Sequence, residues 1–234
     1  MSLSTNTLLA GLRDGLIVSC QPVTGGPLDR PDIVAAFALA AEHGGARGLR
    51  IEGLANLRAV RAVTRLPIIG LIKRIDPATP IIITATVADA EGLAEAGADI
   101  IAFDATIRPG RPATVEALSA AAHAAGRLAM ADLSSLSEAE AALAAGVDIL
   151  GTTLSGYTGG PVPEAPDIDL VQACAALPRP VFAEGRYRDF AEVRAARTAG
   201  ASAVVIGSAI TRPEHATRWY ADIMAEPLGR GRAP

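Results

Sequence analysis

Apolar residues along this chain fall into two alternating kinds of segment. In the first kind, four to six mostly apolar residues stand together, which predicts strands buried on both faces of a parallel sheet. In the second kind, apolar residues recur every three to four positions, which predicts amphipathic helices. The predicted strands are residues 16–20, 47–51, 67–72, 99–103, 128–132, 147–152, 180–184 and 203–206.

A repeated unit joins helices to strands. The segments EAGADIIAFDAT (95–106), AAGVDILGTTL (144–154) and TAGASAVVIGS (198–208) each end a helix on Ala-Gly and continue into a buried strand. HGGARGLRIEG (43–53) is a looser copy. A turn of two or three residues after a helix leads to a neighbouring parallel strand, with glycine ending the helix. The predicted helices are residues 33–43, 54–64, 87–96, 114–125, 137–145, 168–177, 189–198 and 214–224.

Strand and helix alternate eight times, which favours a closed (β/α)8 TIM barrel over an open doubly wound sheet. The 234 residues are close to the length of one such barrel, so we predict a single domain over 1–234 with a core at about 12–224. Residues 227–234 are predicted to be a frayed tail. Residues 80–84 are predicted as an extra short strand. No GxGxxG follows the first strand, which argues against a dinucleotide site.

Composition narrows the classes of function. A net charge of −4 argues against a nucleic-acid-binding protein, and no apolar run approaches the length needed to span a membrane. Cys20 and Cys174 lack paired spacing, so we expect reduced thiols in a cytoplasmic protein. Cys20 ends a strand with no histidine placed to activate it, and we interpret it as a packing residue. The three histidines all fall in helices, so no histidine metal site is expected at the strand ends.

Polar residues stand where the predicted strands end, which in a TIM barrel is where active sites lie. Lys73 follows six apolar residues, and burial beside other cations would leave it a neutral amine able to take a proton from carbon. A lysine and Glu184 facing one cavity fit proton transfer next to a carbonyl, although either residue could simply be a solvated strand end. The strand-end residues are Gln21, Arg50, Glu52, Lys73, Asp104, Asp132, Thr152, Thr153 and Glu184.

Glycine turns follow the last two strands, at Gly185 and at Gly207-Ser208, with Arg212 shortly after. Backbone N–H groups of such turns can approach a phosphate closely, and the turns after strands seven and eight of a TIM barrel are a recurrent phosphate site. The alternative is that these glycines only cap strands and stop helices.

Eight motifs, taken together and in order, are more specific than any one of them. They resemble the N-acetylmannosamine-6-phosphate 2-epimerase family over about residues 12–224. The resemblance implies interconversion of N-acetylmannosamine 6-phosphate and N-acetylglucosamine 6-phosphate in sialic-acid and amino-sugar catabolism, without metal or organic cofactor. It also favours a homodimer. The motifs are LIVSCQP, GLRIEG, PIIGLIKR, DIIAFDATIRP, MADLSS, LGTTLSGYT, VFAEGR and VVIGSAITRP.

The resemblance also implies roles for single residues. Lys73 would transfer the proton, with Glu184 as its catalytic partner. The residues implied to hold the sugar are Gln21, Arg50 and Asp132. Those implied to hold the phosphate are Gly185, Arg186, Gly207 and Ser208, with Arg212 beside them. Ser208 departs from the family pattern, in which a second glycine is frequent.

Two other functions fit the same barrel. One is another phosphate-binding enzyme, such as a pentose-phosphate epimerase. The other is a sugar-phosphate sensor without turnover, which would need neither Lys73 nor Glu184. Trp219 and Tyr220 in the last helix, in a chain with 3% aromatic residues, suit either a subunit contact or closure of the barrel.

Overall fold

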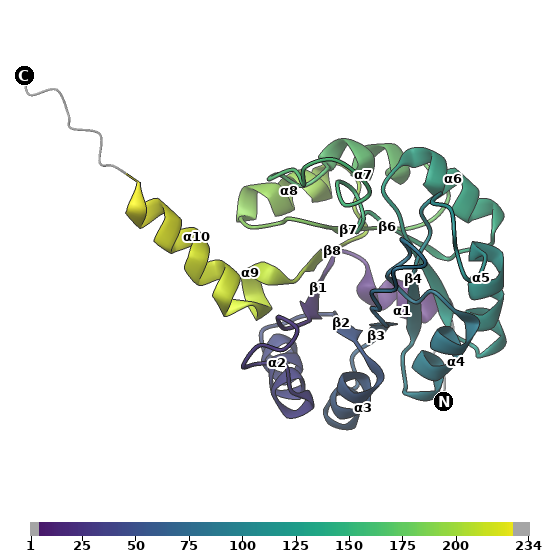
Figure 1. The fold of residues 1–234 in the computed structure, drawn as a ribbon, viewed down its shortest axis with the longest axis horizontal. Coiled ribbons are helices and arrows are strands. Elements are labelled where there is room, and N and C mark those ends of the chain that lie inside the picture. The colour runs from purple at the N-terminus through teal and green to yellow at the C-terminus, as the bar shows by residue number, and fades with distance from the viewer. Residues whose placement is uncertain (1–4, 227–234) are drawn as a thin grey trace, which may run out of the picture.

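Eight parallel strands close into a barrel in the computed structural model of this chain, which describes residues 5–226 (Figure 1). Each strand pairs with the next in sequence, and β8 pairs with β1. The predicted TIM barrel is confirmed, while the tail predicted at 227–234 lies outside the described residues. The strands are β1 (Gly15–Cys20), β2 (Gly48–Glu52), β3 (Ile68–Leu71), β4 (Ile100–Asp104), β5 (Leu128–Asp132), β6 (Ile149–Gly151), β7 (Val181–Glu184) and β8 (Ala203–Ile206).

Helices alternate with the strands and lie around the barrel (Figure 1). Several begin at a side chain that accepts a hydrogen bond from the backbone N–H three residues on: Thr86, Thr114, Ser135, Asp167 and Asp189. Such caps satisfy N–H groups that the helix itself leaves unpaired. The helices are α1 (Thr5–Leu12), α2 (Pro31–His43), α3 (Leu54–Val63), α4 (Val87–Glu95), α5 (Val115–Ala124), α6 (Leu136–Ala144), α7 (Ile168–Ala175), α8 (Phe190–Thr198), α9 (Ser208–Thr211) and α10 (Pro213–Ala225).

Alternate residues of each strand face opposite sides, which produces two apolar layers. On β3, Ile69 and Leu71 belong to the cluster inside the barrel, whereas Ile68 belongs to the cluster between barrel and helices. The inner cluster is formed mainly by Ile17, Ile69, Leu71, Ile100, Ala102, Leu128, Met130, Ile149, Phe182, Ala203 and Val205. The same parity therefore decides which polar residues at the strand ends enter the mouth of the barrel.

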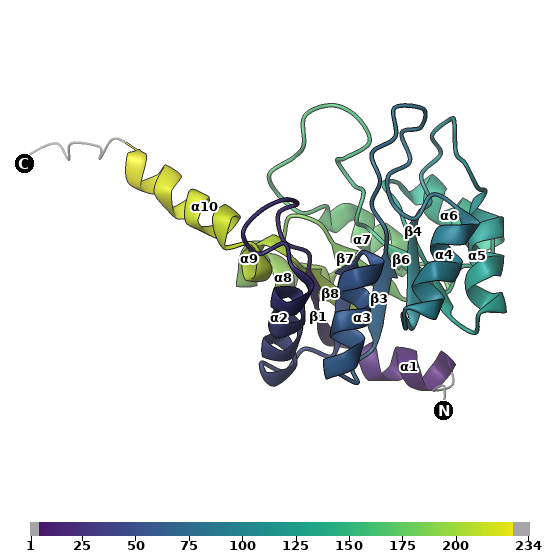
Figure 2. The ribbon, with the colours of Figure 1, turned by 60° about the horizontal axis from the view of Figure 1, so that its bottom comes forward.

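The N-terminal helix α1 is an element that the sequence analysis missed, because its eight residues look like a short polar lead. Its Leu8 and Leu12 are buried and join the inner cluster of the barrel. A Cβ at Gly48 would stand 2.7 Å from Cδ2 of Leu12, so this glycine makes room for the helix. Figure 2 shows α1 at one end of the barrel and the long loops after β3, β4 and β6 at the other. The apolar helix thus closes the end opposite the mouth.

The predicted extra strand at residues 80–84 is wrong. Ile83 makes a single antiparallel bridge to Lys73, and Ile81 and Ile83 are buried. The apolar residues that suggested a strand instead anchor the loop between β3 and α4. Because Thr84 N donates to Ile72 O and the Thr84 hydroxyl accepts from Ile72 N, the loop is held against the residue that precedes Lys73.

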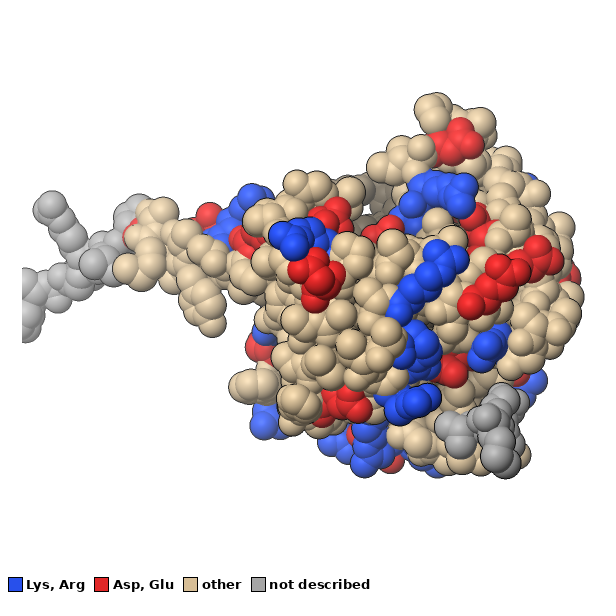
Figure 3. Space-filling view, turned by 90° about the horizontal axis from the view of Figure 1, so that it is seen from below, with Lys and Arg blue, Asp and Glu red and all other residues tan. Residues whose placement is uncertain are grey.

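The last helix, α10, does not close the barrel. It projects away from it in all three views (Figures 1, 2 and 3) and has no buried residue. Tyr220, Ile223 and Met224 are exposed. The guanidinium carbon of Arg188 lies 5.0 Å from the centre of the Trp219 ring. On the barrel face in Figure 3, Lys and Arg side chains are flanked by Asp and Glu, so this face carries charges of both signs.

Candidate active site

Because side chains alternate along each strand, the predicted polar residues enter the barrel at the end where the strands finish, the mouth. Arg50 lies between Leu49 and Ile51, which pack outside the barrel, so its side chain points inward. Asp132 and Glu184 continue the inward positions of Met130 and Phe182. Lys73 stands two residues after the inward-facing Leu71, just beyond the end of β3. Four charged groups on four strands therefore converge.

Arg50 is the centre of this cluster. Its guanidinium donates from Nη1 to Asp132 Oδ1 at 3.1 Å and from Nη2 to Asp132 Oδ2 at 2.6 Å. Arg50 Nη1 also lies 3.0 Å from Glu184 Oε2. The side chains of Arg50 and Asp132 are 1% and 0% exposed, and that of Glu184 is 14% exposed. One cation therefore faces two carboxylates, in a place where solvent screens little.

Two consecutive threonines after β6 complete the surroundings of Glu184. The Thr152 hydroxyl donates to Glu184 O at 3.0 Å and accepts from Glu184 N at 3.1 Å, which fixes the backbone. The Thr153 hydroxyl lies 2.6 Å from Asp132 Oδ1 and 3.2 Å from Glu184 Oε2. A Cβ at Gly151 would stand 2.5 Å from Met130 Cε and 3.1 Å from Asp132 Oδ1, so a larger residue here would displace the end of the Met130 side chain and crowd Asp132.

Lys73 lies at the open side of the same cluster. Its ammonium donates to Gln21 Oε1 at 2.6 Å, and the Gln21 amide donates in turn to Ser19 Oγ at 2.7 Å. The lysine side chain is exposed to solvent, although charged groups of the mouth stand close to its amine. Desolvation at the mouth and the positive charges of Arg50 and Arg212 lower the pKa of Lys73, against the opposing pull of Glu52 and Glu184. Because solvent reaches the exposed side chain, the charges of the two arginines are the main cause.

Glu184 shifts in the opposite direction. Burial raises its pKa above the ordinary 4.5, and the negative charge of Asp132 adds to this, while Arg50, Lys73 and, when it donates to Glu184, the Thr153 hydroxyl oppose it. Both shifts favour neutral groups, a free amine at Lys73 and a protonated carboxyl at Glu184. A base and an acid in those states, facing one cavity, can remove a proton from carbon and supply one to oxygen.

The turn after β8 lies against β1. The Thr211 hydroxyl donates to Ser19 O at 2.7 Å, and Arg212 Nε donates to Gln21 O at 2.6 Å. A Cβ at Gly207 would stand 3.3 Å from Ser19 Cβ. Gly207 precedes Ser208, the first residue of α9. These contacts place Gly207 beside Ser19 and Arg212 beside Gln21, the hydrogen-bond partner of Lys73.

The turn after β7 holds Gly185 and Arg186 in the left-handed region, with φ of 117° and 64°. A φ of 64° is strained for arginine, and contacts of the Arg186 side chain hold the turn in this conformation. The guanidinium donates to Ala165 O at 2.7 Å and to Ser155 O, and it lies 5.5 Å from the ring centre of Tyr157. The Arg186 side chain thus binds the β6–α7 loop, and only the backbone of Arg186 remains at the turn after β7.

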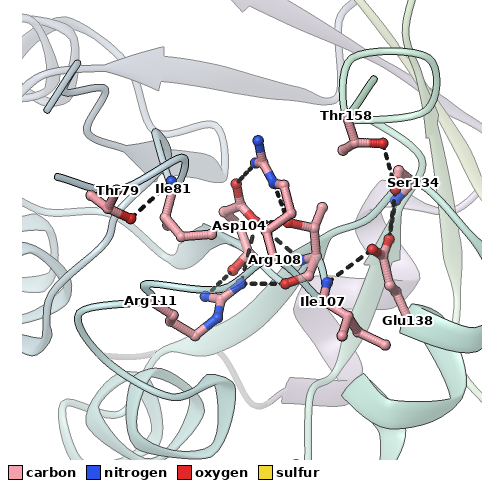
Figure 4. A network of polar contacts seen from close by, with 10 residues as sticks. Thr79, Ile81, Asp104, Ile107, Arg108, Arg111, Ser134, Glu138 and Thr158 are labelled. Carbon is pink, nitrogen blue, oxygen red and sulfur yellow. Dashed lines mark hydrogen bonds and ion pairs between the residues drawn. The ribbon is translucent and has the colours of Figure 1, made fainter. Parts of the chain in front are cut away.

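A second charged network lies beyond the first, around the β4–α5 loop (Figure 4). Asp104, fully buried, binds Arg108 Nη2 at 2.5 Å, Arg111 Nη2 at 3.3 Å and the Thr106 hydroxyl at 2.6 Å. Glu138 accepts from Ile107 N and Ser134 N and so joins this loop to the next. Asp104 was among the strand-end candidates, and in the structure its side chain binds Thr106, Arg108 and Arg111 of its own loop instead of the Lys73 cluster.

Two absences concern residues 5–226. No three histidine, cysteine, aspartate or glutamate side chains in this range are grouped so that they could hold a metal ion. No helix in the same range is long and apolar enough to cross a membrane. Cys20 is buried, which raises the pKa of its thiol to about 12, as suits a packing residue rather than a nucleophile.

Residues 34–226 match the family model described as "Putative N-acetylmannosamine-6-phosphate epimerase". The chain belongs to the N-acetylmannosamine-6-phosphate epimerase family. A relative from Klebsiella pneumoniae, named "Putative N-acetylmannosamine-6-phosphate 2-epimerase", is 56% identical over 206 residues, which are 88% of each chain. One from Escherichia coli with the same name is 53% identical over 214 residues, 92% of this chain and 93% of its own.

A solved structure extends the family match to three dimensions. The N-acetylmannosamine-6-phosphate 2-epimerase from Clostridium perfringens superposes with a TM-score of 0.89 at 39% identity, covering 92% of this chain and 96% of its own. A thiamine phosphate pyrophosphorylase from Pyrococcus furiosus has a TM-score of 0.60 at 16% identity, covering 93% of this chain and 100% of its own, a likeness of fold alone. The resemblance drawn from the eight motifs is therefore confirmed for the epimerase family.

Proposed function

We propose that this protein interconverts N-acetylmannosamine 6-phosphate and N-acetylglucosamine 6-phosphate by moving the proton at C2. The observation that carries the proposal is the meeting of Lys73 and Glu184 at one barrel mouth, with pKa shifts that favour a free amine and a protonated carboxyl. Membership of the epimerase family supplies the substrate. We place the reaction in amino-sugar and sialic-acid breakdown in the cytoplasm.

The C2 proton becomes acidic enough only in the open-chain sugar, where C2 stands next to the C1 aldehyde. Lys73 takes this proton, and the electron pair of the C2–H bond forms the C1–C2 double bond as negative charge moves to O1. Glu184 gives its proton to O1, and Arg50 lies close enough to both carboxylates to stabilise the charge left behind. Lys73 then gives its proton to the other face of C2 while O1 returns its proton to Glu184, which completes the inversion. Gln21 and Asp132 orient the sugar.

We assign the phosphate to the turns after β7 and β8, which are adjacent because these strands pair. Its ligands are the backbone N–H groups at Gly185, Arg186, Gly207 and Ser208, the Ser208 hydroxyl and the side chain of Arg212. The φ of 117° at residue 185 favours glycine, and a Cβ at residue 207 would stand in tight contact with Ser19 Cβ, at 3.3 Å. The phosphate is remote from C2, so its binding energy can hold the open-chain sugar against Lys73.

The test is proton NMR of N-acetylmannosamine 6-phosphate in D2O with the purified protein. We expect loss of the C2 proton signal and growth of the N-acetylglucosamine 6-phosphate signals with deuterium at C2. Binding without either change would identify a sensor. Turnover of a pentose phosphate in place of the amino sugar would identify the other type of epimerase.

We also propose a homodimer, with α10 as the subunit contact. The support is the exposure of Tyr220 and Met224 at 75% and 84% on a helix that projects from the barrel. Analytical ultracentrifugation of the wild type and of Met224→Glu tests this. A dimer that the substitution converts to a monomer is expected, and a wild-type monomer at micromolar concentration would contradict it.

A further inference from the structure

Thr153 holds a position between the two carboxylates of the mouth that the proposed reaction does not yet use. Its Oγ1 lies 2.6 Å from Asp132 Oδ1 and 3.2 Å from Glu184 Oε2. A hydroxyl carries one proton and two acceptor lone pairs, so it donates to only one of these oxygens at a time. The shorter distance, typical of a strong O–H···O bond to an ionised acceptor, assigns that proton to Asp132.

Once the hydroxyl donates to Asp132, it presents lone pairs to Glu184 Oε2. An ionised Glu184 would then face them with its own lone pairs, whereas a protonated Glu184 donates a hydrogen bond. We propose that Thr153 is a positioning residue, whose hydroxyl assigns the single proton of the Asp132–Glu184 pair to Glu184. The chain of hydrogen bonds runs from the Glu184 carboxyl through Thr153 to the Asp132 carboxylate.

The charges around the pair agree with this assignment. Arg50 makes two bonds to Asp132 but only one contact to Glu184, so the ionised form of Asp132 is the better compensated. Lys73 is the remaining charged group that faces Glu184, and a free amine there leaves Arg50 and Asp132 as one balanced ion pair. A buried ion pair with no surplus charge is the least costly state for such a cluster.

The same hydroxyl can also serve the charged form of Glu184. When the sugar is bound, the Glu184 O–H turns from Thr153 to the sugar oxygen and gives up its proton, and the Thr153 O–H can then turn about the Cβ–Oγ bond and donate to Glu184. The heavy atoms stay in place, because both acceptors are already within reach. When the sugar oxygen returns its proton to Glu184, the O–H turns back to Asp132.

This inference rests on the proposed function for its role in catalysis, but the proton assignment can be tested without turnover. The experiment is a ¹³C NMR titration of protein labelled at the glutamate carboxyls, with the Glu184 signal assigned by its absence in Glu184→Gln. We expect Thr153→Val to lower the pKa of Glu184 by about one pH unit, since the carboxyl proton loses its acceptor. A rise, or no change, would overturn the assignment, because a hydroxyl that merely donates to Glu184 would hold this pKa down.

Kinetics and two further variants complete the test. Thr153→Ser keeps the hydroxyl and should titrate as the wild type does, with kcat within about twofold, whereas Thr153→Val should lose about tenfold. Thr106→Val is the matched control, since it removes a hydroxyl 2.6 Å from another buried aspartate and should leave the Glu184 titration unmoved. If Thr153→Val does not fold, Thr153→Ala gives the same sign. A normal titration in a protein inactive on the sugar would contradict the proposed function alone.

Discussion

Two buried aspartates on neighbouring strands have opposite surroundings. Asp104 on β4 and Asp132 on β5 are paired in register, both point into the barrel and both are fully buried. Asp104 has Arg108 and Arg111 to itself, whereas Asp132 shares Arg50 with Glu184. At Asp104, two cations face one carboxylate, whereas at Asp132 and Glu184 one cation faces two carboxylates.

The count of charges, more than burial, separates a structural cluster from a reactive one. The Asp104 side chain joins the β4–α5 loop to its own strand, and its contacts to Thr106, Arg108 and Arg111 lie within that segment (Figure 4). The Asp132 cluster draws its members from β2, β5, β7 and Thr153, the second residue after β6. This cluster faces Lys73, which in the proposed reaction takes the C2 proton while Glu184 supplies a proton to O1. The predictions below test this contrast.

The largest effect is expected at Lys73. Lys73→Met removes the amine that takes the C2 proton, so C2 exchange in D2O should fall to the background rate while the circular dichroism spectrum stays unchanged. Exchange near the wild-type rate in the folded variant would remove the lysine from the mechanism.

The phosphate should contribute at least about a hundredfold to kcat/KM, because each charge-assisted hydrogen bond to it is worth roughly 1.5–3 kcal/mol and at least two are expected. N-acetylmannosamine without phosphate should accordingly be a very poor substrate. Gly207→Val should lower kcat/KM for the phosphorylated sugar to the same degree, since the valine side chain would crowd both Ser19 and the phosphate oxygens. Equal turnover of both sugars by the wild type would rule out the phosphate site.

Glu184→Gln should lower kcat by about a hundredfold or more and change the pH profile. In the wild type, activity should fall with decreasing pH as Lys73 takes up a proton, and fall with increasing pH as Glu184 loses one. The lowered pKa of Lys73 and the raised pKa of Glu184 increase the fraction of enzyme with both groups neutral. The alkaline decline should be absent in Glu184→Gln. A loss of only a few-fold would leave Glu184 an orienting role.

Stability should reverse the ranking of the two aspartates. Asp104→Asn leaves the half-buried Arg108 and Arg111 without a counter-charge and should lower the free energy of unfolding by about 3 kcal/mol. Asp132→Asn should lower it less, because Glu184 can ionise and keep Arg50 paired. Urea denaturation of both variants measures the difference. A larger loss in Asp132→Asn would contradict the contrast between the clusters.

The smallest effect is expected from chelation. The proposed reaction meets the developing charge with Arg50 and Glu184, so prolonged treatment with EDTA should leave kcat unchanged. Inactivation that a divalent cation reverses would favour the pentose-phosphate type of epimerase, and apo-protein prepared by a second chelator serves as the control.

Much of the fold was readable from the sequence because the signals are local. Buried strands and amphipathic helices differ in period, and the repeated Ala-Gly units mark where one leads into the other. The eight strands of the structure fall at the predicted places, although β6 is shorter, at Ile149–Gly151. The errors have a common cause. The apolar residues of α1 and of the segment at 80–84 bury themselves against the barrel, which no local period reveals.

The sequence by itself determined the barrel, its family and the set of polar residues that reach the mouth, because alternation along each strand depends only on neighbouring residues. The tertiary structure alone decided the pairing within that set. Arg50 and Asp132 are 82 positions apart, and only closure of the barrel brings them together. It also sent the Arg186 side chain to the β6–α7 loop and α10 away from the barrel. Hydrogen bonds and ion pairs act over a few ångströms, so which groups share a proton is fixed only when the strands have met.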